Sequence, residues 1–315
     1  MEKNGKNKLI LDSEAVFVYI IGMSKKINSI LLLFLTSIIW GFAFVAQRKG
    51  MESLDPMTFN GIRFAIGAVV VGLLYRWNPA TDEKTPFPWL PGIILFIAAS
   101  LQQIGIVWTT AGNAGFITGL YVVFVPILGL LIGQRLRFLN LVAVFISVIG
   151  IYLISVKHNF SINIGDLIVL ISAFFWAFHV QVIGRYTKKT SSIYLAFSQY
   201  AVCAIGSLIA GFIYLLWKQP EAISNLSIFA SIYDAGIPII YGGLFSVGIA
   251  YTLQVEAQKH IDPTTSVLIL CLESVFAMFG GWLLLHELVS FKMLIGAFLM
   301  LTAMVISSLA YARKE

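Results

Sequence analysis

Long apolar stretches separated by short polar breaks repeat along almost the whole chain. Each stretch has roughly 18–25 residues, and an α-helix needs about 20 to cross the hydrocarbon core of a bilayer. The stretches are continuously apolar and lack the alternation that marks membrane-spanning strands. The pattern therefore predicts an all-α integral membrane protein with about ten transmembrane helices, over residues 29–47, 57–76, 90–110, 113–133, 138–156, 165–184, 191–217, 236–256, 263–285 and 291–311.

The polar break between the third and fourth stretches, at residues 111–113, is very short. We divide the chain there because one helix over residues 90–133 would be about twice too long for a bilayer. Residues 1–28 predict a cytoplasmic, disordered N-terminal extension, since the apolar patch at residues 15–22 is too short to span. We interpret Met23 as the natural start, with residues 1–22 either unstructured or foreign to the natural protein.

Composition supports the bilayer as the solvent of this chain. Hydrophobic residues make up 59% and charged residues 11%, with a mean hydropathy of +0.89, whereas soluble domains carry about 25% charged residues. The net charge is +6, but the basic residues lie in short runs between apolar stretches, which argues against a nucleic-acid partner. Cys203 and Cys271 lie within apolar stretches without metal-ligand spacing, so we expect neither a disulfide framework nor a metal or cofactor.

Lysine and arginine are divided unevenly between the two sets of loops. With the N-terminus inside, fifteen fall on inside segments and five on outside segments. Cytoplasmic loops carry such an excess in membrane proteins. We therefore predict a multi-pass protein of the cell (cytoplasmic) membrane with both termini in the cytoplasm and an even number of spans.

The two halves of the chain resemble each other weakly. Three pairs of segments carry the similarity: Trp40-Gly41-Phe42 with Trp176-Ala177-Phe178, residues 104–109 with 247–252, and Phe124-Val125-Pro126 with Leu272-Glu273-Ser274. Each half holds five predicted spans, and an odd number per repeat places the second copy upside down in the membrane. Inverted repeats are typical of alternating-access transporters, whose substrate site lies near the midplane between the repeats.

Short motifs accompany this order of spans: Trp40-Gly41-Phe42, Arg63-Phe64, residues 113–126, Ala257-Gln258-Lys259-His260, and Leu272-Glu273-Ser274 followed by His286-Glu287. With the ten-span order, they resemble the EamA-type transporters of the drug/metabolite transporter (DMT) superfamily over residues 29–312. The resemblance implies two inverted five-helix repeats, over residues 29–156 and 165–312. It also implies export, or less often import, of amino acids, nucleobase-like metabolites or other small organic solutes. Two residues depart from the family pattern: Ser274 stands where Pro is usual, and His286 stands where Gly is usual.

Arg63 and Glu273 are the two charges deepest within predicted spans. A charge at the bilayer centre costs roughly 2.5–3.5 kcal/mol on insertion scales, so it usually faces a partner or a cavity. We predict that they form a coupling site or a charge pair, with Glu273 as the candidate titrating group. The alternatives are a structural pair or helix-end anchor for Arg63, and a hydrogen bond to a neighbouring helix for Glu273.

Polar and aromatic side chains within the spans are the candidates for substrate binding. Aromatic rings can shape a mostly apolar pocket, although Trp and Tyr also form interface belts and amides also pack helices together. We expect one central site walled by spans one, three, four, six, eight and nine. The candidate substrate-binding residues are Trp40, Gln103, Trp108, Asn113, Tyr121, Trp176, His179, Tyr251, Gln254 and Glu273.

Catalytic and nucleotide-binding motifs are incomplete in this sequence. His286-Glu287 begins like the zinc motif H-E-x-x-H, but Ser290 stands at the second ligand position. No Walker motif occurs, so ATP is not the energy source within this chain. The sequence predicts a secondary transporter, a monomer or homodimer, that exports a small amino acid-like or other organic solute, with a proton as candidate coupling ion. A lipid flippase of the same fold and an intramembrane enzyme are the alternatives.

Overall fold

The computed structural model describes residues 4–77, 86–155, 163–221, 226–286 and 288–312, which form helices and no strand. Backbone groups in a bilayer find no water to bond, so apolar segments satisfy them internally as helices. Nine helices in this described part are long and apolar enough to cross a membrane, and a tenth apolar helix over Phe138–Leu153 is shorter. The predicted all-α membrane class is confirmed, while length and composition alone support nine crossings rather than ten.

The helices follow the predicted stretches closely, and several predicted spans consist of two or three consecutive helical pieces. In chain order they are α1 (Asn4–Gly50), α2 (Pro56–Trp77), α3 (Trp89–Ile106), α4 (Ala111–Gly119), α5 (Tyr121–Leu131), α6 (Phe138–Ser155), α7 (Ile164–Tyr186), α8 (Ser192–Lys218), α10 (Ser227–Asp234), α11 (Gly236–Ile240), the π-helix η1 (Tyr241–Tyr251), α12 (Thr252–Ala257), α13 (Pro263–Leu270), α14 (Glu273–Leu285) and α15 (Phe291–Ala312).

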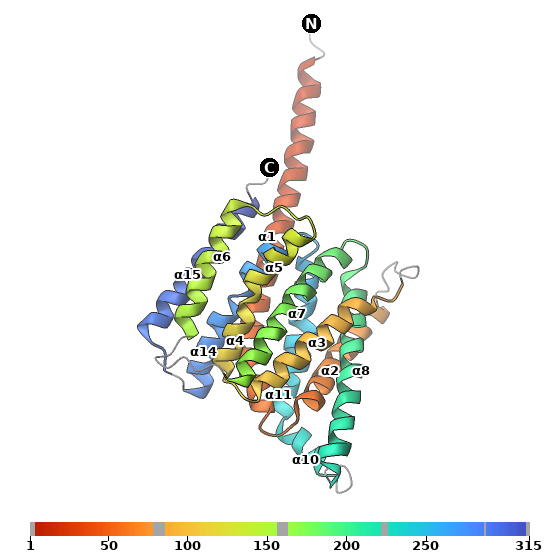
Figure 1. Ribbon diagram of the computed structural model, residues 1–315. Helices are drawn as coiled ribbons and strands as arrows, with labels where there is room; N and C mark the ends of the chain where they lie inside the picture. Colours follow the sequence, from red (N-terminus) through yellow and green to blue (C-terminus); the bar gives the residue numbers. More distant parts are fainter. Residues whose placement is uncertain (1–3, 78–85, 156–162, 222–225, 287, 313–315) are drawn as a thin grey trace.

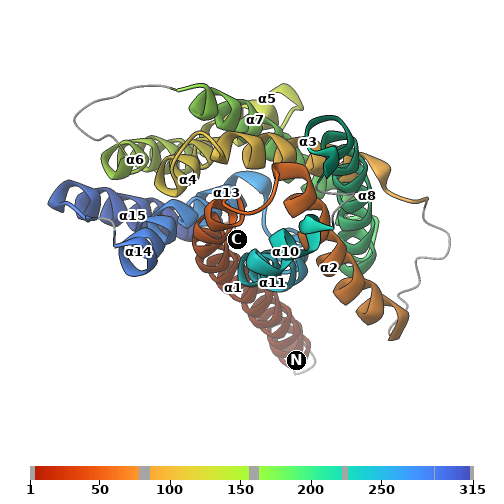
Figure 2. The ribbon, with the colours of Figure 1, turned by 90° about the horizontal axis from the view of Figure 1, so that it is seen from below.

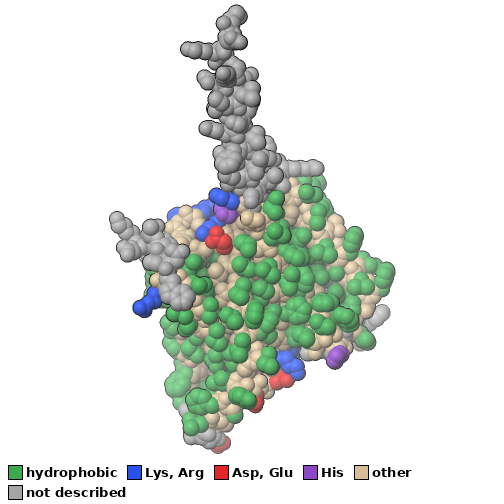
Figure 3. Space-filling model, turned by 180° about the vertical axis from the view of Figure 1, so that it is seen from behind, with side chains coloured by type: hydrophobic (Ala, Val, Ile, Leu, Met, Phe, Trp, Pro, Cys, Tyr) green, Lys and Arg blue, Asp and Glu red, His purple; other side chains and the backbone are tan. Residues whose placement is uncertain are grey.

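The long helices lie side by side in one layer, and each runs from one face of the layer to the other (Figure 1). Helix α1 begins on the same side of this layer on which α15 ends. Seen from below, α6, α14 and α15 occupy one end of an elongated cross-section, and α2 and α8 occupy the other (Figure 2). On the face seen in Figure 3, hydrophobic side chains cover a broad band, with charged side chains at its upper and lower edges. Such a band is the surface that a bilayer would cover.

Helix contacts in the first half of the chain have counterparts in the second half. If each helix is replaced by the helix at the same position in the other half, the resulting pairs are also in contact. Taking α1 to α6 as one half and α7 to α15 as the other, α2 corresponds to α8 and α6 to α15, and each of these pairs is in contact. Helix α3 packs on α7 just as η1 packs on α1, and α4 and α5 pack on α7 just as α13 and α14 pack on α1. The same exchange relates the contact of α2 with η1 to that of α3 with α8.

Helix α1 extends well beyond the first predicted span. It begins at Asn4, so the backbone of residues 4–28 is helical where the sequence predicted a disordered extension (Figure 1). The physical reason is that nucleation is the costly step of helix formation. Once the first span is helical, a flanking segment without proline adds turns at little cost.

Two spans are interrupted near their middle. Helix α4 gives way to α5 at Leu120 (φ −63°, ψ −13°), and α13 gives way to α14 at Cys271 and Leu272 (φ −60°, ψ −14° at Leu272). Hydrogen bonds at both places join residues three apart, as in a 3₁₀ turn, from the N–H of Val123 to the carbonyl of Leu120 (2.9 Å) and from that of Ser274 to Cys271 (3.1 Å). The second interruption arises without the proline that the family usually carries at position 274.

The two interrupted spans also begin alike. Thr110 caps α4 by accepting a hydrogen bond from the N–H of Asn113, and Asp262 caps α13 by accepting one from the N–H of Thr265. Each interruption follows its cap by about the same number of residues, so Leu120 is equivalent to Leu272 and the next residue, Tyr121, to Glu273. Alignment from the caps thus differs by about one helical turn from the pairing of Phe124 with Leu272 expected from sequence.

Candidate functional site

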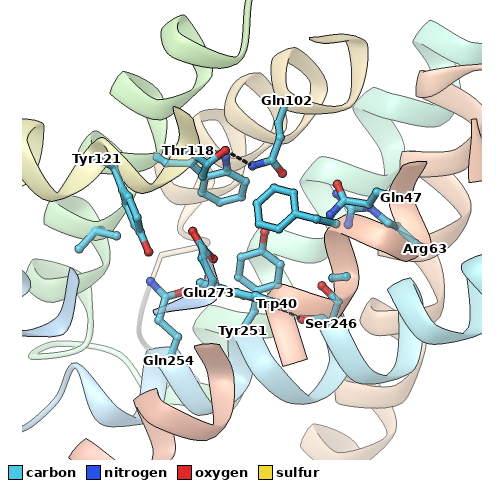
Figure 4. Close-up of a pocket in the computed structure, with 14 residues that line it drawn as sticks. Trp40, Gln47, Arg63, Gln102, Thr118, Tyr121, Ser246, Tyr251, Gln254 and Glu273 are labelled. Atoms are coloured by element: carbon cyan, nitrogen blue, oxygen red, sulfur yellow. Dashed lines mark hydrogen bonds between the residues drawn. The ribbon is translucent and has the colours of Figure 1, made fainter. Parts of the chain in front are cut away.

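A pocket lies inside the helix layer and receives side chains from both halves of the chain (Figure 4). Its empty volume is about 420 Å³, part of it open to solvent. Its walls come from the six expected spans and also from α2. The lining residues are Trp40, Ala43, Phe44, Gln47, Arg63, Gln102, Thr118, Tyr121, Trp176, Val180, Ser246, Tyr251, Gln254 and Glu273.

Aromatic rings form one wall of this pocket, with Tyr251 of η1 at its centre. The ring of Trp40 lies 4.5 Å from that of Tyr251, tilted by 58°, and the ring of Trp176 stacks on it at 5.8 Å and 21°. The indole N–H of Trp40 donates to the carbonyl of Ser246 at 3.3 Å, which joins α1 to the π-helix. The two tryptophans that the sequence comparison paired therefore both contact the ring of Tyr251.

Acidic and polar groups gather at one end of the pocket. Figure 4 shows the ends of Tyr121, Gln254 and Glu273 pointing toward one another. Tyr121 is the first residue of α5 and Glu273 the first of α14, so the two mid-span interruptions place them there.

Arg63 lies on the opposite side of the pocket from Glu273 (Figure 4). Its Nε donates to Asn60 Oδ1 at 2.8 Å, and its guanidinium carbon lies 4.9 Å from the centre of the Phe64 ring. Only 1% of its surface is exposed. The sequence suggested a charge pair between Arg63 and Glu273, but the structure joins Arg63 to Asn60 and places the two charges apart across the pocket.

Polar atoms around the pocket lack hydrogen-bond partners among the described residues. Buried polar groups in folded proteins are nearly always bonded to protein or water, so a cluster of exceptions indicates a place for water or a solute. The unpartnered atoms of lining residues include Gln47 Oε1, Arg63 Nη2, Trp176 Nε1, Gln254 Oε1 and Glu273 Oε1. Together they offer both donors and acceptors to a bound molecule.

Most of the residues predicted to bind substrate lie on the pocket: Trp40, Tyr121, Trp176, Tyr251, Gln254 and Glu273, with Arg63 opposite. Two others lie behind its wall. His179 is buried against Gln199 Oε1 (2.7 Å) and packs edge-on to Trp176, and the side chain of Gln103 donates to the backbone carbonyl of Gln47 (3.5 Å).

The remaining two predicted residues, Trp108 and Asn113, lie near the connection between α3 and α4, away from the pocket. The side chain of Trp108 is more than half exposed, as in an interface belt.

Four polar lining residues were not among the predicted site residues: Gln47, Gln102, Thr118 and Ser246. Gln102 is adjacent to the predicted Gln103 and faces the pocket in its place, bonding Thr118 Oγ1 at 3.0 Å. The signal that could have found Gln102 is the helical phase of α3, because neighbouring residues on a helix face different directions. Within the described ranges, no three His, Cys, Asp or Glu side chains come together as a metal site would require.

A pocket lined by aromatic and polar side chains, between membrane-crossing helices from two halves of one chain, is typical of membrane transport proteins. The chain belongs to the EamA-like transporter family, whose model matches residues 27–156 and 163–309.

Curated relatives agree with this assignment. An uncharacterized transporter of Archaeoglobus fulgidus is 30% identical over 90% of this chain and 87% of its own length. The uncharacterized transporter YoaV of Bacillus subtilis is 22% identical over 89% of this chain and 96% of its own. A crystal structure of a protein 17% identical to this one covers 91% of this chain and 98% of its own, with a TM-score of 0.71, so the fold is shared.

Proposed function

We propose that this protein is a secondary transporter that exports a small, amino acid-like organic solute, which binds in the pocket between the two halves. The observation that carries the proposal is a buried pocket with unpartnered polar atoms at both ends, Arg63 Nη2 at one and Glu273 Oε1 at the other. Burying such groups costs free energy unless they are hydrogen-bonded. A solute with a carboxylate and an ammonium group would satisfy both ends at once.

Alternating access would follow from an inverted repeat of five helices in each half. The contact pattern that survives exchange of the halves supports such a repeat, as do the equivalent interruptions before Tyr121 and Glu273. The family model also matches the chain twice, over residues 27–156 and 163–309. In transporters with inverted repeats, the two repeats rock about a fixed central site.

Glu273 is the group that we propose couples transport to protons. It is buried in the pocket, and the other titratable groups around it are Tyr121, Tyr251 and Cys271, with Arg63 across the pocket. A carboxyl group that gains and loses a proton changes the charge of the pocket. That change would favour opposite states of the transporter in turn.

Replacement of Glu273 by glutamine tests the site. The variant Glu273→Gln keeps the shape and hydrogen bonding of the side chain but cannot ionise. We expect cells that overproduce the natural chain to release one or more amino acid-like solutes into the medium, and this release to fall about tenfold or more in the variant, since an unpaired solute charge costs more than 1.4 kcal/mol. The measurement is a survey of solutes inside and outside the cells, followed by radiolabelled flux in vesicles at several pH values.

Glu52→Gln is the matched control, because Glu52 is an exposed carboxylate paired with Lys49 at the surface. We expect release by this control to equal that of the natural chain. Equal membrane levels and equal transport by Glu273→Gln across the pH series would show that Glu273 neither binds the solute nor couples protons. A survey in which no solute changes would contradict export itself.

A further inference from the structure

A second, larger pocket opens on the face of the layer where α5, α7 and α12 end and α6 and α13 begin. Its empty volume is about 950 Å³, part of it open to solvent. Both halves of the chain contribute to it, the first through residues 134–140 and the second through residues 184–188 and 258–264. We call it the basic pocket, because its lining includes Arg135, Arg137, Arg185, Lys188 and Lys259.

Acidic groups do not balance these cations. The only Asp or Glu in the described lining is Asp262, and its carboxylate already accepts hydrogen bonds from the N–H and the hydroxyl of Thr265 at 3.0 and 2.8 Å. Among the described residues Lys259 pairs with Glu256, at 2.7 Å, whereas Arg135, Arg185 and Lys188 have no such partner. Arg135, Arg185 and Lys188 thus leave the pocket with an excess of positive charge, which attracts anions.

A pair of hydrogen-bonded amide side chains joins the lining of the basic pocket to that of the central pocket. Gln254 lines the central pocket and Gln258 lines the basic pocket. Gln254 Nε2 donates to Gln258 Oε1 at 3.1 Å, and Gln258 Nε2 donates to the carbonyl of Val180, also at 3.1 Å. Val180 itself lines the central pocket, so these bonds connect residues of the two linings.

We propose that the basic pocket is an anion-binding vestibule, which takes a phosphate or carboxylate group before the molecule that bears it passes the Gln254–Gln258 pair. The vestibule role rests on the proposed transport function, whereas binding of an anion to the pocket stands on its own. Basic residues also collect on cytoplasmic faces to fix topology. That role needs no concave arrangement, however, and does not distinguish a lysine in the pocket from its neighbour outside it.

Lys188 and Lys189 provide this comparison. Both are exposed in the turn after α7, and Lys188 lines the basic pocket whereas Lys189 does not. The full chain would be purified in nanodiscs of phosphatidylcholine and titrated with inorganic phosphate at constant ionic strength, with the thermal unfolding midpoint as readout. We expect saturable stabilisation of the natural chain and of Lys189→Gln. In Lys188→Gln the half-saturating phosphate concentration rises several-fold, and in Arg135→Gln/Arg185→Gln/Lys188→Gln by about tenfold or more.

A second arm distinguishes a lipid headgroup from a free anion. Phosphatidylglycerol replaces part of the phosphatidylcholine, without phosphate; stabilisation of the natural chain but not of the triple variant identifies the ligand as a headgroup. Absence of an effect in both arms, or equal effects in Lys188→Gln and Lys189→Gln, overturns the proposal. Because these measurements need no transport, they can succeed where the solute survey fails, and they can fail where it succeeds.

Discussion

Arg63 shows how a single cation is held within an apolar layer of helices. One hydrogen bond to Asn60 and contact with the face of the Phe64 ring stabilise the guanidinium. Its Nη2 nevertheless has no partner among the described residues. The planar group is therefore fixed in orientation while one of its ends stays available for an anionic group of a solute.

Replacement of Arg63 by lysine tests whether this orientation matters. Lysine keeps the charge but lacks the planar fork that binds a carboxylate through two hydrogen bonds. We expect Arg63→Lys to weaken the apparent affinity for the exported solute about tenfold or more, measured as flux against solute concentration in vesicles. Arg76→Lys, at the exposed end of α2, is the control and should leave the affinity unchanged; an unchanged affinity in Arg63→Lys would remove the guanidinium from the site.

Backbone conformation explains why glycine is usual at the position of His286. His286 ends α14 with φ 54°, and Gly133 follows α5 with φ 79°. A side chain in this left-handed region costs about 1–2 kcal/mol. We expect His286→Gly to raise the unfolding midpoint in detergent by about 2 °C and Gly133→Ala to lower it similarly. No neighbouring atom lies within 4 Å of a Cβ at Gly133, so the change at Gly133 reports backbone strain alone. Shifts of the same sign in the two variants would contradict this explanation.

The residues of the central pocket were partly predictable, because polar side chains deep in a bilayer cost free energy and usually face a partner or a cavity. That argument placed Trp40, Trp176 and Glu273 on the pocket. It did not separate Gln102 from Gln103. Helical phase places the two on different faces of α3, but the packing of α3 against α7 and α8 decides which face borders the pocket. That argument also could not show that His179 packs against Trp176 without lining the pocket. A position deep in a span is common to residues that line a pocket and to residues that pack behind them.

At the scale of elements, spans were predictable and their interruptions were not. The number of residues in an apolar run gives the length of the helix, and the thickness of the bilayer sets the length that a crossing needs. The 3₁₀ turns at Leu120 and Leu272 carry no proline and keep both residues close to helical dihedral angles. They are visible only when the two spans are compared from their caps, Thr110 and Asp262, which requires knowing that both residues are caps.

Close approach of α1 and α14 depends on Gly41. A Cβ at this position would meet Phe276 and come within 2.8 Å of the backbone nitrogen of Ala277, so the helices would have to separate. Overpacking of this kind typically costs about 1–3 kcal/mol. We expect Gly41→Ala to lower the unfolding midpoint by several degrees in detergent. Gly236→Ala is the control, because nothing lies within 4 Å of a Cβ there; equal midpoints for the two variants would show that the contact is loose.

On the scale of the whole molecule, the number of crossings depends on α6. Nine described helices meet the length and composition expected of a span, and the apolar part of α6 is shorter. Yet α1 begins and α15 ends on the same side of the layer (Figure 1), which requires an even number of crossings. Pairing of α6 with α15 across the exchange of halves also indicates that α6 spans the layer.

Labelling of single cysteines tests the tenth crossing and the orientation together. Arg135 precedes α6 and Ile164 begins α7, and both are exposed, so cysteines at these positions lie on opposite sides of the membrane only if α6 crosses it. The charge bias of the loops predicts Arg135→Cys on the cytoplasmic side and Ile164→Cys outside. A membrane-impermeant maleimide added to intact cells should therefore label Ile164→Cys alone, and Arg135→Cys only after permeabilisation. The native Cys203 and Cys271 are buried and should contribute little background. Labelling of both variants in intact cells would contradict a crossing by α6, and labelling of Arg135→Cys alone would reverse the orientation.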